Sequence, residues 1–210
     1  MGTSFTLKEA RSWINTAAAD IEKNSSLLGD LDAAIGDGDH GDNMARGFTA
    51  VVKKLDTGSF AELGALFKTV GMTLLSTVGG AAGPLYGGFF LTLGKQSAGK
   101  TELDTPGLAT ALEAGVQDIK HRGKAVLGDK TMVDALTPAL AAFKSSGDSL
   151  PAATRAAAET AADAAEKTSP LLARKGRASY LGERSIGHKD PGAASSAILL
   201  QALAKVCARA

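Results

Sequence analysis

The sequence has a single cysteine, and this scarcity limits how the chain can be stabilised. Cys207 is the only cysteine among 210 residues, so no disulfide can form within the chain. Nothing in the neighbouring sequence indicates a site that would stabilise its thiolate. We therefore expect Cys207 to be an unreactive, structural residue.

The chain also lacks an excess of charge of either sign. Its 23 lysine and arginine residues are balanced by 22 aspartate and glutamate residues, which gives a formal net charge of +1. A protein with so little net charge has no general field that would attract nucleic acid or an anionic membrane. We expect no nucleic-acid partner, and any electrostatic function must come from local clusters.

Long hydrophobic runs are missing as well. The longest apolar stretch, residues 85–93, contains two glycines and is too short to span a bilayer. Residues 1–9 lack the basic start and apolar core of a signal peptide. We therefore expect a soluble, cytoplasmic protein with no membrane association.

What the chain does contain is a helical period of apolar residues along most of its length. Helix starts are indicated by capping boxes at Thr6 with Glu9 and at Ser59 with Glu62, and by prolines in a first turn at Pro106 and Pro191. Strand-like alternation is not sustained anywhere. The sequence predicts an all-α protein, a single domain over residues 1–210, with about eight antiparallel helices in an up-and-down bundle or closed barrel. The expected helices cover about 7–21, 44–55, 60–77, 83–94, 105–121, 131–145, 151–167 and 191–208.

Three carboxylates lie close together in a glycine-rich stretch, residues 31–41. Asp32, Asp37 and Asp39 fall within eight residues, and the intervening glycines permit a tight turn. At a spacing of about 5 Å, each pair would repel by roughly 3 kcal/mol at an effective dielectric of about 20, which a bound cation would relieve. Oxygen ligands favour Mg²⁺ or Ca²⁺, the spacing is not that of an EF-hand, and Mg²⁺ commonly shares its ligands with phosphate. The alternative is that Asp39 only caps the next helix, the other two carboxylates are solvated, and His40 is a structural hydrogen-bonding residue.

Two further segments have the composition of phosphate-binding loops. Residues 76–84 join two helices through small residues and could bind an anion at a helix start, although they do not form a Walker A loop. They could equally form a tight helix crossing. Residues 168–190 form a long segment with five Lys or Arg between 174 and 189 against one Glu. This segment indicates phosphate clamping, unless it is a solvated surface loop with Tyr180 and Leu181 as anchors.

Taken in order, these motifs resemble the nucleotide-binding L subunit of bacterial dihydroxyacetone kinase. The resemblance is carried by GDGDHGDNM at 36–44, STVGGAAGPLYG at 76–87, GDKTM at 128–132 and ARKGRASYLGERSIGHKDPGA at 173–193, and it covers essentially the whole chain. It implies an eight-helix antiparallel barrel that binds ADP or ATP at one end. Asp32, Asp37 and Asp39 would hold two Mg²⁺ ions and, with Arg177, form the catalytic set. The residues expected beside the nucleotide are His40, Gly41, Asp42, Asn43, Ala81, Ala82, Gly123, Met132, Arg177, Asp190, Pro191 and Gly192.

The resemblance also implies a reaction and its partners. Such a subunit passes the terminal phosphoryl group of its nucleotide to dihydroxyacetone held on a separate K subunit, and an M subunit restores that group from phosphoenolpyruvate. The chain contains no K-like region and no evident base for the sugar hydroxyl, so we expect a separate L subunit, inactive alone, and a homodimer. Family members often carry Ser or Thr where this chain has Ala82, so one phosphate contact would be lost here. Alternatives are an ATP-dependent kinase subunit for another small sugar, a relative of the fatty-acid kinases, or a nucleotide-sensing partner of a transcription regulator.

Overall fold

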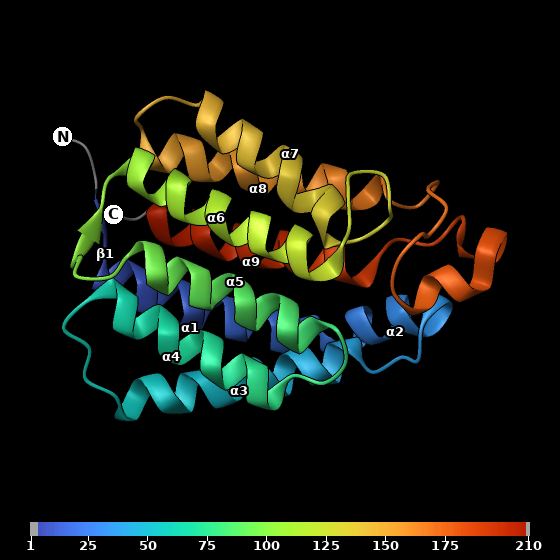
Figure 1. Ribbon diagram of the computed structural model, residues 1–210, viewed down its shortest axis with the longest axis horizontal. Helices are drawn as coiled ribbons and strands as arrows, with labels where there is room; N and C mark the ends of the chain where they lie inside the picture. Colours follow the sequence, from blue (N-terminus) through green and yellow to red (C-terminus); the bar gives the residue numbers. More distant parts are fainter. Residues whose placement is uncertain (1–3, 209–210) are drawn as a thin grey trace.

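The computed structural model describes residues 4–208, and nine α-helices account for most of them (Figure 1). A 3₁₀ helix, η1, and two strands of two residues each complete the elements. The helices are α1 (Leu7–Lys23), α2 (Ser25–Ile35), α3 (His40–Thr57), α4 (Leu63–Thr77), α5 (Ala82–Gln96), α6 (Thr105–Gly123), α7 (Met132–Ser145), α8 (Leu150–Glu166) and α9 (Pro191–Cys207), with η1 at Arg177–Ser185, β1 at Phe5–Thr6 and β2 at Glu102–Leu103.

Eight of these helices run alternately up and down and close into a ring. Each of α3 to α8 packs against the next helix along the chain, and α1 packs against both α3 and α9, which closes the circle. The remaining helix, α2, packs mainly on α3 at one end of the ring (Figure 1). The predicted all-α, antiparallel barrel is therefore confirmed, with α2 as an addition that the sequence did not lead us to expect.

The inside of the ring is filled by apolar side chains, with a group of aromatic rings among them. Trp13 lies between Phe5, Phe67 and Phe90, with ring centroids 5.5–6.1 Å from its own. These four residues are fully buried, and the Trp13 Nε1–H donates to the carbonyl of Leu199 at 2.8 Å. Burial of these apolar side chains supplies the main driving force for folding, and the aromatic group fixes α1 against α4, α5 and α9.

Most of the expected helix starts are present. Thr6 and Glu9 form a capping box at α1, and the side chains of Asp104 and Asp190 cap α6 and α9. The capping box expected at Ser59 was wrong. Helix α4 begins later, at Leu63, and the Glu62 carboxylate accepts a hydrogen bond from the Gly99 N–H instead.

The connections between helices divide between the two ends of the ring. The start of α1, the end of α9 and the short β1–β2 pair lie at one end in Figure 1, whereas α2, η1 and the turns that join α4 to α5 and α6 to α7 gather at the other. The four motifs at 36–44, 76–87, 128–132 and 173–193 all contribute to this second end. Within residues 4–208, no helix has the length and apolar character needed to cross a bilayer.

Candidate functional site

A cavity of about 260 Å³ opens at the end of the ring where the motifs gather. Its walls come from the α2–α3 turn, the α4–α5 turn, the end of α6, the start of α7 and the start of α9. The remaining wall comes from residues 168–190, which we call the basic segment. All but two of the expected site residues line the cavity. Those present are Asp32, Asp37, Asp39, His40, Asn43, Ala81, Ala82, Gly123, Met132, Arg177, Asp190, Pro191 and Gly192.

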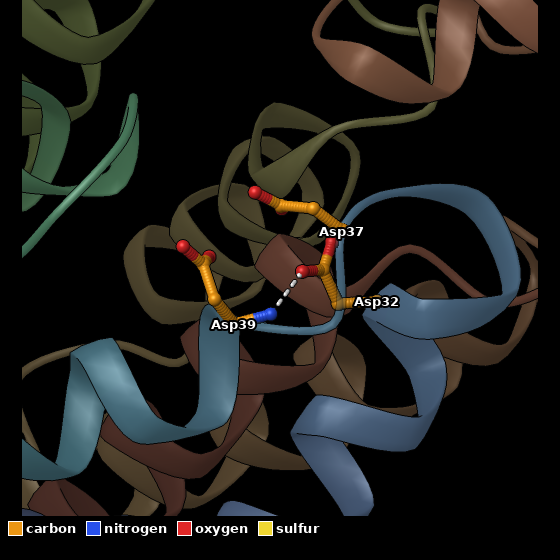
Figure 2. A group of neighbouring side chains, drawn as sticks. All are labelled: Asp32, Asp37 and Asp39. Carbon is orange, nitrogen blue, oxygen red and sulfur yellow. Dashed lines mark hydrogen bonds between the residues drawn. The ribbon is translucent and has the colours of Figure 1, made fainter.

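The three expected aspartates converge at the rim of this cavity (Figure 2). Asp32 lies in the last turn of α2, Asp37 in the following turn, and Asp39 directly before α3. One carboxylate oxygen from each lies within 4.8 Å of the others. The Asp32 carboxylate accepts hydrogen bonds from the N–H groups of Asp39, at 3.0 Å, and His40, at 3.2 Å, so the turn is tied to α2.

The backbone of the turn explains this convergence. Gly38 has a φ of +79°, a conformation that other residues rarely adopt, and it reverses the chain between Asp37 and Asp39. Asp39 is the residue before α3, yet its side chain accepts no capping hydrogen bond among the described residues. Figure 2 shows that its carboxylate points to the same side of the turn as the carboxylate of Asp37. The interpretation that Asp39 serves only as a helix cap therefore does not account for its position.

The donor set of the acidic cluster suits a hard divalent cation. All three ligands are carboxylates, Asp32 is half-buried, and Asp37 and Asp39 are exposed toward the cavity mouth. Three negative charges held this close repel one another, and an ion that accepts oxygen ligands, such as Mg²⁺, would offset that repulsion. A zinc site would instead be expected to include His or Cys.

The two expected residues outside the cavity lining have other positions. Gly41 is buried where α3 crosses α2, and a Cβ atom at this position would lie 1.9 Å from the Ser25 carbonyl oxygen. Asp42 is exposed in the first turn of α3, where a negative charge is favourable beside the helix dipole. Gly41 thus acts by allowing α2 and α3 to approach, and neither residue contacts the cavity.

The glycine-rich turn between α4 and α5 forms a second wall. Gly79, Gly80, Ala81 and Ala82 line the cavity, and Ala81, the residue before α5, offers no side-chain acceptor to the first N–H groups of that helix. A helix start of this kind can bind an anion. The turn is held by Arg46 of α3, whose Nε–H donates to the Thr77 carbonyl at 3.1 Å.

The basic segment contributes fewer residues than its charge suggested. Lys175 and Arg177 line the cavity, and an Arg177 guanidinium nitrogen lies 2.8 Å from an Asp37 carboxylate oxygen. Leu181 packs against the small cluster of Ile35, Ala173 and Ala178, as expected of an anchor. Tyr180 does not: it is 87 % exposed, so the alternative in which it anchors the segment on the core does not hold for this residue.

A chain of hydrogen bonds behind the acidic cluster was not predicted. His40 Nε2 lies 2.9 Å from the Ser195 hydroxyl, which lies 2.7 Å from the Tyr86 hydroxyl. Burial lowers the pKa of His40, and Asp32 and Asp39 oppose that shift, whereas burial raises the pKa of Tyr86 to about 12. Both groups are therefore neutral near pH 7, and they join α3, α5 and α9 beneath the cavity. The sequence signals were the adjacent serines of α9 and His40, for which a structural hydrogen-bonding role was the alternative given above.

Lys130 and Asp190 are the buried charged residues of the cavity lining. Burial raises the pKa of Asp190 to about 7, its hydrogen bond from the Ala193 N–H opposes this, Asp134 raises it, and Lys130 lowers it. Lys130 is 1 % exposed, and burial lowers its pKa while Asp190 raises it. Lys130 lies in the quoted GDKTM motif, but its type gave no sign that it would be buried.

The far side of the cavity is apolar. Leu85, Ile119, Ala125, Met132 and Val133 line it, and only Met132 of these five had been expected near a ligand. The cavity therefore has a charged rim and an apolar far wall. This division suits a ligand with an anionic end and a flat or apolar end.

Comparison with known proteins gives a consistent result. The family model described as "DAK2 domain" matches residues 34–205. A relative from Listeria innocua, "PEP-dependent dihydroxyacetone kinase 1, ADP-binding subunit DhaL", is 47 % identical over 91 % of this chain and 92 % of its own length. The Lactococcus lactis protein "PTS-dependent dihydroxyacetone kinase, ADP-binding subunit DhaL" is 44 % identical over 97 % of this chain and 100 % of its own.

Among solved structures, the chain resembles the dihydroxyacetone kinase from C. freundii in complex with AMP-PNP and Mg²⁺. The two share 28 % identity with a TM-score of 0.74 over 98 % of this chain. This chain spans 35 % of that kinase, so the likeness concerns one part of a longer protein.

Proposed function

Because this chain belongs to the DAK2-domain family, we propose that it is the ADP-binding subunit of a dihydroxyacetone kinase and carries the phosphoryl group to the sugar. The observation that supports this most strongly is the meeting of Asp32, Asp37 and Asp39 at the rim of a cavity with an apolar far wall. This arrangement matches a magnesium nucleotide, which has a charged phosphate tail and a flat aromatic base that can pack on apolar side chains.

The acidic cluster would hold magnesium, with two ions as our proposal. The carboxylates of Asp32, Asp37 and Asp39 provide the oxygen ligands, and bound ions would neutralise charge on the phosphate groups of the nucleotide. The two N–H donors to Asp32 hold that carboxylate in place before any ion arrives. Asp37 and Asp39 are exposed at the cavity mouth, and a bound ion would compete with Arg177 for the Asp37 carboxylate.

The nucleotide would lie across the cavity from its rim to its apolar wall. We place its phosphates between the acidic cluster, the start of α5 and Arg177, and its base against Leu85, Ile119 and Met132. The backbone N–H groups at Ala81 and Ala82 could serve where relatives use a hydroxyl. Pro191 and Gly192 at the start of α9, with Asp190, form the floor beside Met132.

Phosphoryl transfer by such a site depends on positioning and on charge neutralisation more than on covalent chemistry by the protein. Arg177 would stabilise the terminal phosphoryl group, since it is the arginine that lines the cavity among the described residues. The sugar would be presented by a separate K subunit, and the nucleotide would be recharged from phosphoenolpyruvate through an M subunit. Relatives of matching length carry the descriptions "PEP-dependent" and "PTS-dependent", which favours this donor over free ATP.

Two measurements test the proposal. Calorimetric titration with ADP in the presence of Mg²⁺ should give micromolar or tighter affinity for the wild-type chain and a loss of at least about tenfold for Asp37→Asn, because one charged ligand is gone. Asp30→Asn is the matched control, since Asp30 is an exposed carboxylate on α2. Dihydroxyacetone phosphorylation should also require added K subunit. Unchanged affinity in Asp37→Asn, or robust kinase activity by this chain alone, would contradict the assignment.

A further inference from the structure

Lys130 lies at the base of the basic segment, with its ammonium group enclosed by backbone carbonyls. Its Nζ donates to the carbonyl oxygens of Thr168, at 3.0 Å, Ser169, at 3.2 Å, and Leu171, at 3.1 Å. The carbonyl of His188 is a fourth acceptor, so the three ammonium protons are shared among four oxygens. The first three acceptors follow α8 directly, and the fourth lies just before α9, so one side chain joins both ends of a segment of some twenty residues.

The position of this ammonium group is itself fixed by its neighbours. Lys130 has a φ of +62°, an uncommon conformation for a residue other than glycine, and it lies directly before a capping box. In that box the Asp134 carboxylate accepts a 2.7 Å hydrogen bond from the Thr131 N–H. On the other side, the Asp129 carbonyl accepts from the Arg174 N–H at 3.0 Å. The 126–134 region therefore holds Lys130 rigidly against the basic segment.

Other bonds close the same base but do not replace Lys130. The Gly187 N–H donates to the Ser169 carbonyl at 2.8 Å, and the Asp190 N–H donates to the Thr168 hydroxyl at 2.9 Å. Each joins one pair of residues, whereas the Lys130 ammonium gathers four carbonyls. Backbone carbonyls buried without a donor are costly, so removing the ammonium would favour opening of the segment to water.

The segment that Lys130 closes is the one that carries Arg177. With its ends drawn together, the middle of the segment folds over the cavity, and Arg177 meets Asp37. The ammonium protons are committed to carbonyls and the side chain is 1 % exposed, so Lys130 is poorly placed to bind a phosphate directly. Its effect on the cavity must act through the backbone that it holds.

We propose that Lys130 is a positioning residue, whose ammonium group clamps residues 168–171 to His188 and thereby holds Arg177 over the nucleotide site. The part of this inference that concerns the nucleotide rests on the proposed function. The clamp itself does not, and it can be tested without any ligand.

The first test is limited trypsin digestion of the full-length, ligand-free chain, with cleavage sites assigned by mass spectrometry. Lys130→Met keeps most of the unbranched side chain, one atom shorter, but removes every donor. Trypsin cuts after Arg174, Lys175, Arg177 and Arg184 once the segment opens, and we expect these cuts to be faster than in wild type by about tenfold or more. Lys124→Met is the matched control, because Lys124 also has a positive φ, of 47°, and its side chain is exposed.

The second test separates positioning from a general loss of stability. ADP affinity is measured for Lys130→Met, Arg177→Ala and the double variant. If Lys130 acts through Arg177, its replacement should weaken binding about tenfold in the wild-type background and by less than about twofold in Arg177→Ala. Equal losses in both backgrounds would overturn the positioning role. Should Lys130→Met fail to fold by circular dichroism, Lys130→Gln, which keeps two donors on a shorter side chain, takes its place in both tests.

Failure of the proposed function and failure of the Lys130 clamp would give different results. A wild-type chain that binds no ADP would overturn the proposed function, and the digestion experiment would still decide the clamp. Equal cleavage of Lys130→Met and Lys124→Met would overturn the clamp while ADP binding by the wild type stood. Selective cleavage within residues 174–184 of Lys130→Met supports it.

Discussion

Arg177 of the 3₁₀ helix reaches Asp37 of the α2–α3 turn, with a guanidinium nitrogen 2.8 Å from a carboxylate oxygen. The two side chains are 64 % and 35 % exposed, so this surface ion pair contributes little to stability. The ion pair matters because of its position, since it links the basic segment to the acidic cluster at the mouth of the cavity. A ligand that brings both magnesium and phosphate would supply each side of the pair with a stronger partner.

The first prediction concerns Arg177→Ala. Removing the guanidinium leaves the three carboxylates with less compensation, so we expect Mn²⁺ alone to bind more tightly, by about two- to threefold. Mg-ADP should bind about tenfold more weakly, because a charged phosphate partner is lost. Calorimetry with each ligand measures both effects. Arg184→Ala, an exposed arginine outside the cavity lining, should change neither affinity, and a parallel weakening of both ligands in Arg177→Ala would argue against this role.

The second prediction concerns Gly41. A Cβ atom here would lie 1.9 Å from the Ser25 carbonyl oxygen, so Gly41→Ala must push α2 away from α3 and should cost about 3 kcal/mol of unfolding free energy. Gly29→Ala is the control, since its Cβ would lie 3.5 Å from the nearest atom, an ordinary contact. Alanine favours helix over glycine, and this variant should be neutral or slightly more stable. Urea unfolding measures both, and equal midpoints would contradict the close approach of α2 and α3.

The third prediction concerns pH. The pKa of Asp190 in the folded chain is about 7, chiefly because of burial, against an ordinary value of 3.8. The folded state therefore binds a proton that the unfolded state has released, and stability falls as pH rises from about 4 to 7, by up to about 1.4 kcal/mol per pH unit. Asp190→Asn should remove this loss, since an amide can still cap α9.

The measurement for Asp190 is the unfolding free energy of wild type and Asp190→Asn at pH 5 and pH 8, with chelator present. The variant should gain on wild type at the higher pH. Asp134 and Asp32 act with burial on this carboxyl group and Lys130 acts against it, so the comparison is best made in otherwise identical chains. A stability difference that is the same at both pH values would contradict the raised pKa.

The fourth prediction concerns Cys207. Its side chain is fully buried, and burial raises the pKa of its thiol to about 12, so almost no thiolate exists at pH 8. A thiol reagent such as dithionitrobenzoate should react with the native chain at least about 100-fold more slowly than with the urea-unfolded chain. Comparable rates in both states would show that the end of α9 opens readily.

The fold could be predicted largely because its signals are local. Apolar spacing and caps such as Thr6 and Asp104 mark helix starts within a few residues. Helix α2 was not predicted, because only Leu28 and Ile35 are buried in it and its helical period of apolar residues is therefore weak. It also begins at Ser25 without a capping hydrogen bond from a side chain. Asp32 consequently lies on a helix and not, as expected, in a loop.

The candidate site, like the fold, could be predicted only where its sequence signals are local. The types and order of Asp32, Asp37 and Asp39 indicated a cation site, because neighbouring carboxylates in a tight turn are forced together. The role of Lys130 could not be predicted, since its four acceptors are backbone carbonyls some forty to sixty positions away and leave no mark on residue type. The exposure of Tyr180 could not be predicted either, because an aromatic residue is more often packed on a core.

The most direct test of the central claim is native mass spectrometry of the purified chain in the presence of Mg²⁺ and ADP. The account predicts one ADP and two Mg²⁺ bound together per chain, and neither metal nor nucleotide on a variant in which Asp32, Asp37 and Asp39 are all replaced by Asn. Retention of the same masses by that variant, or a wild-type chain that carries no nucleotide, would contradict it.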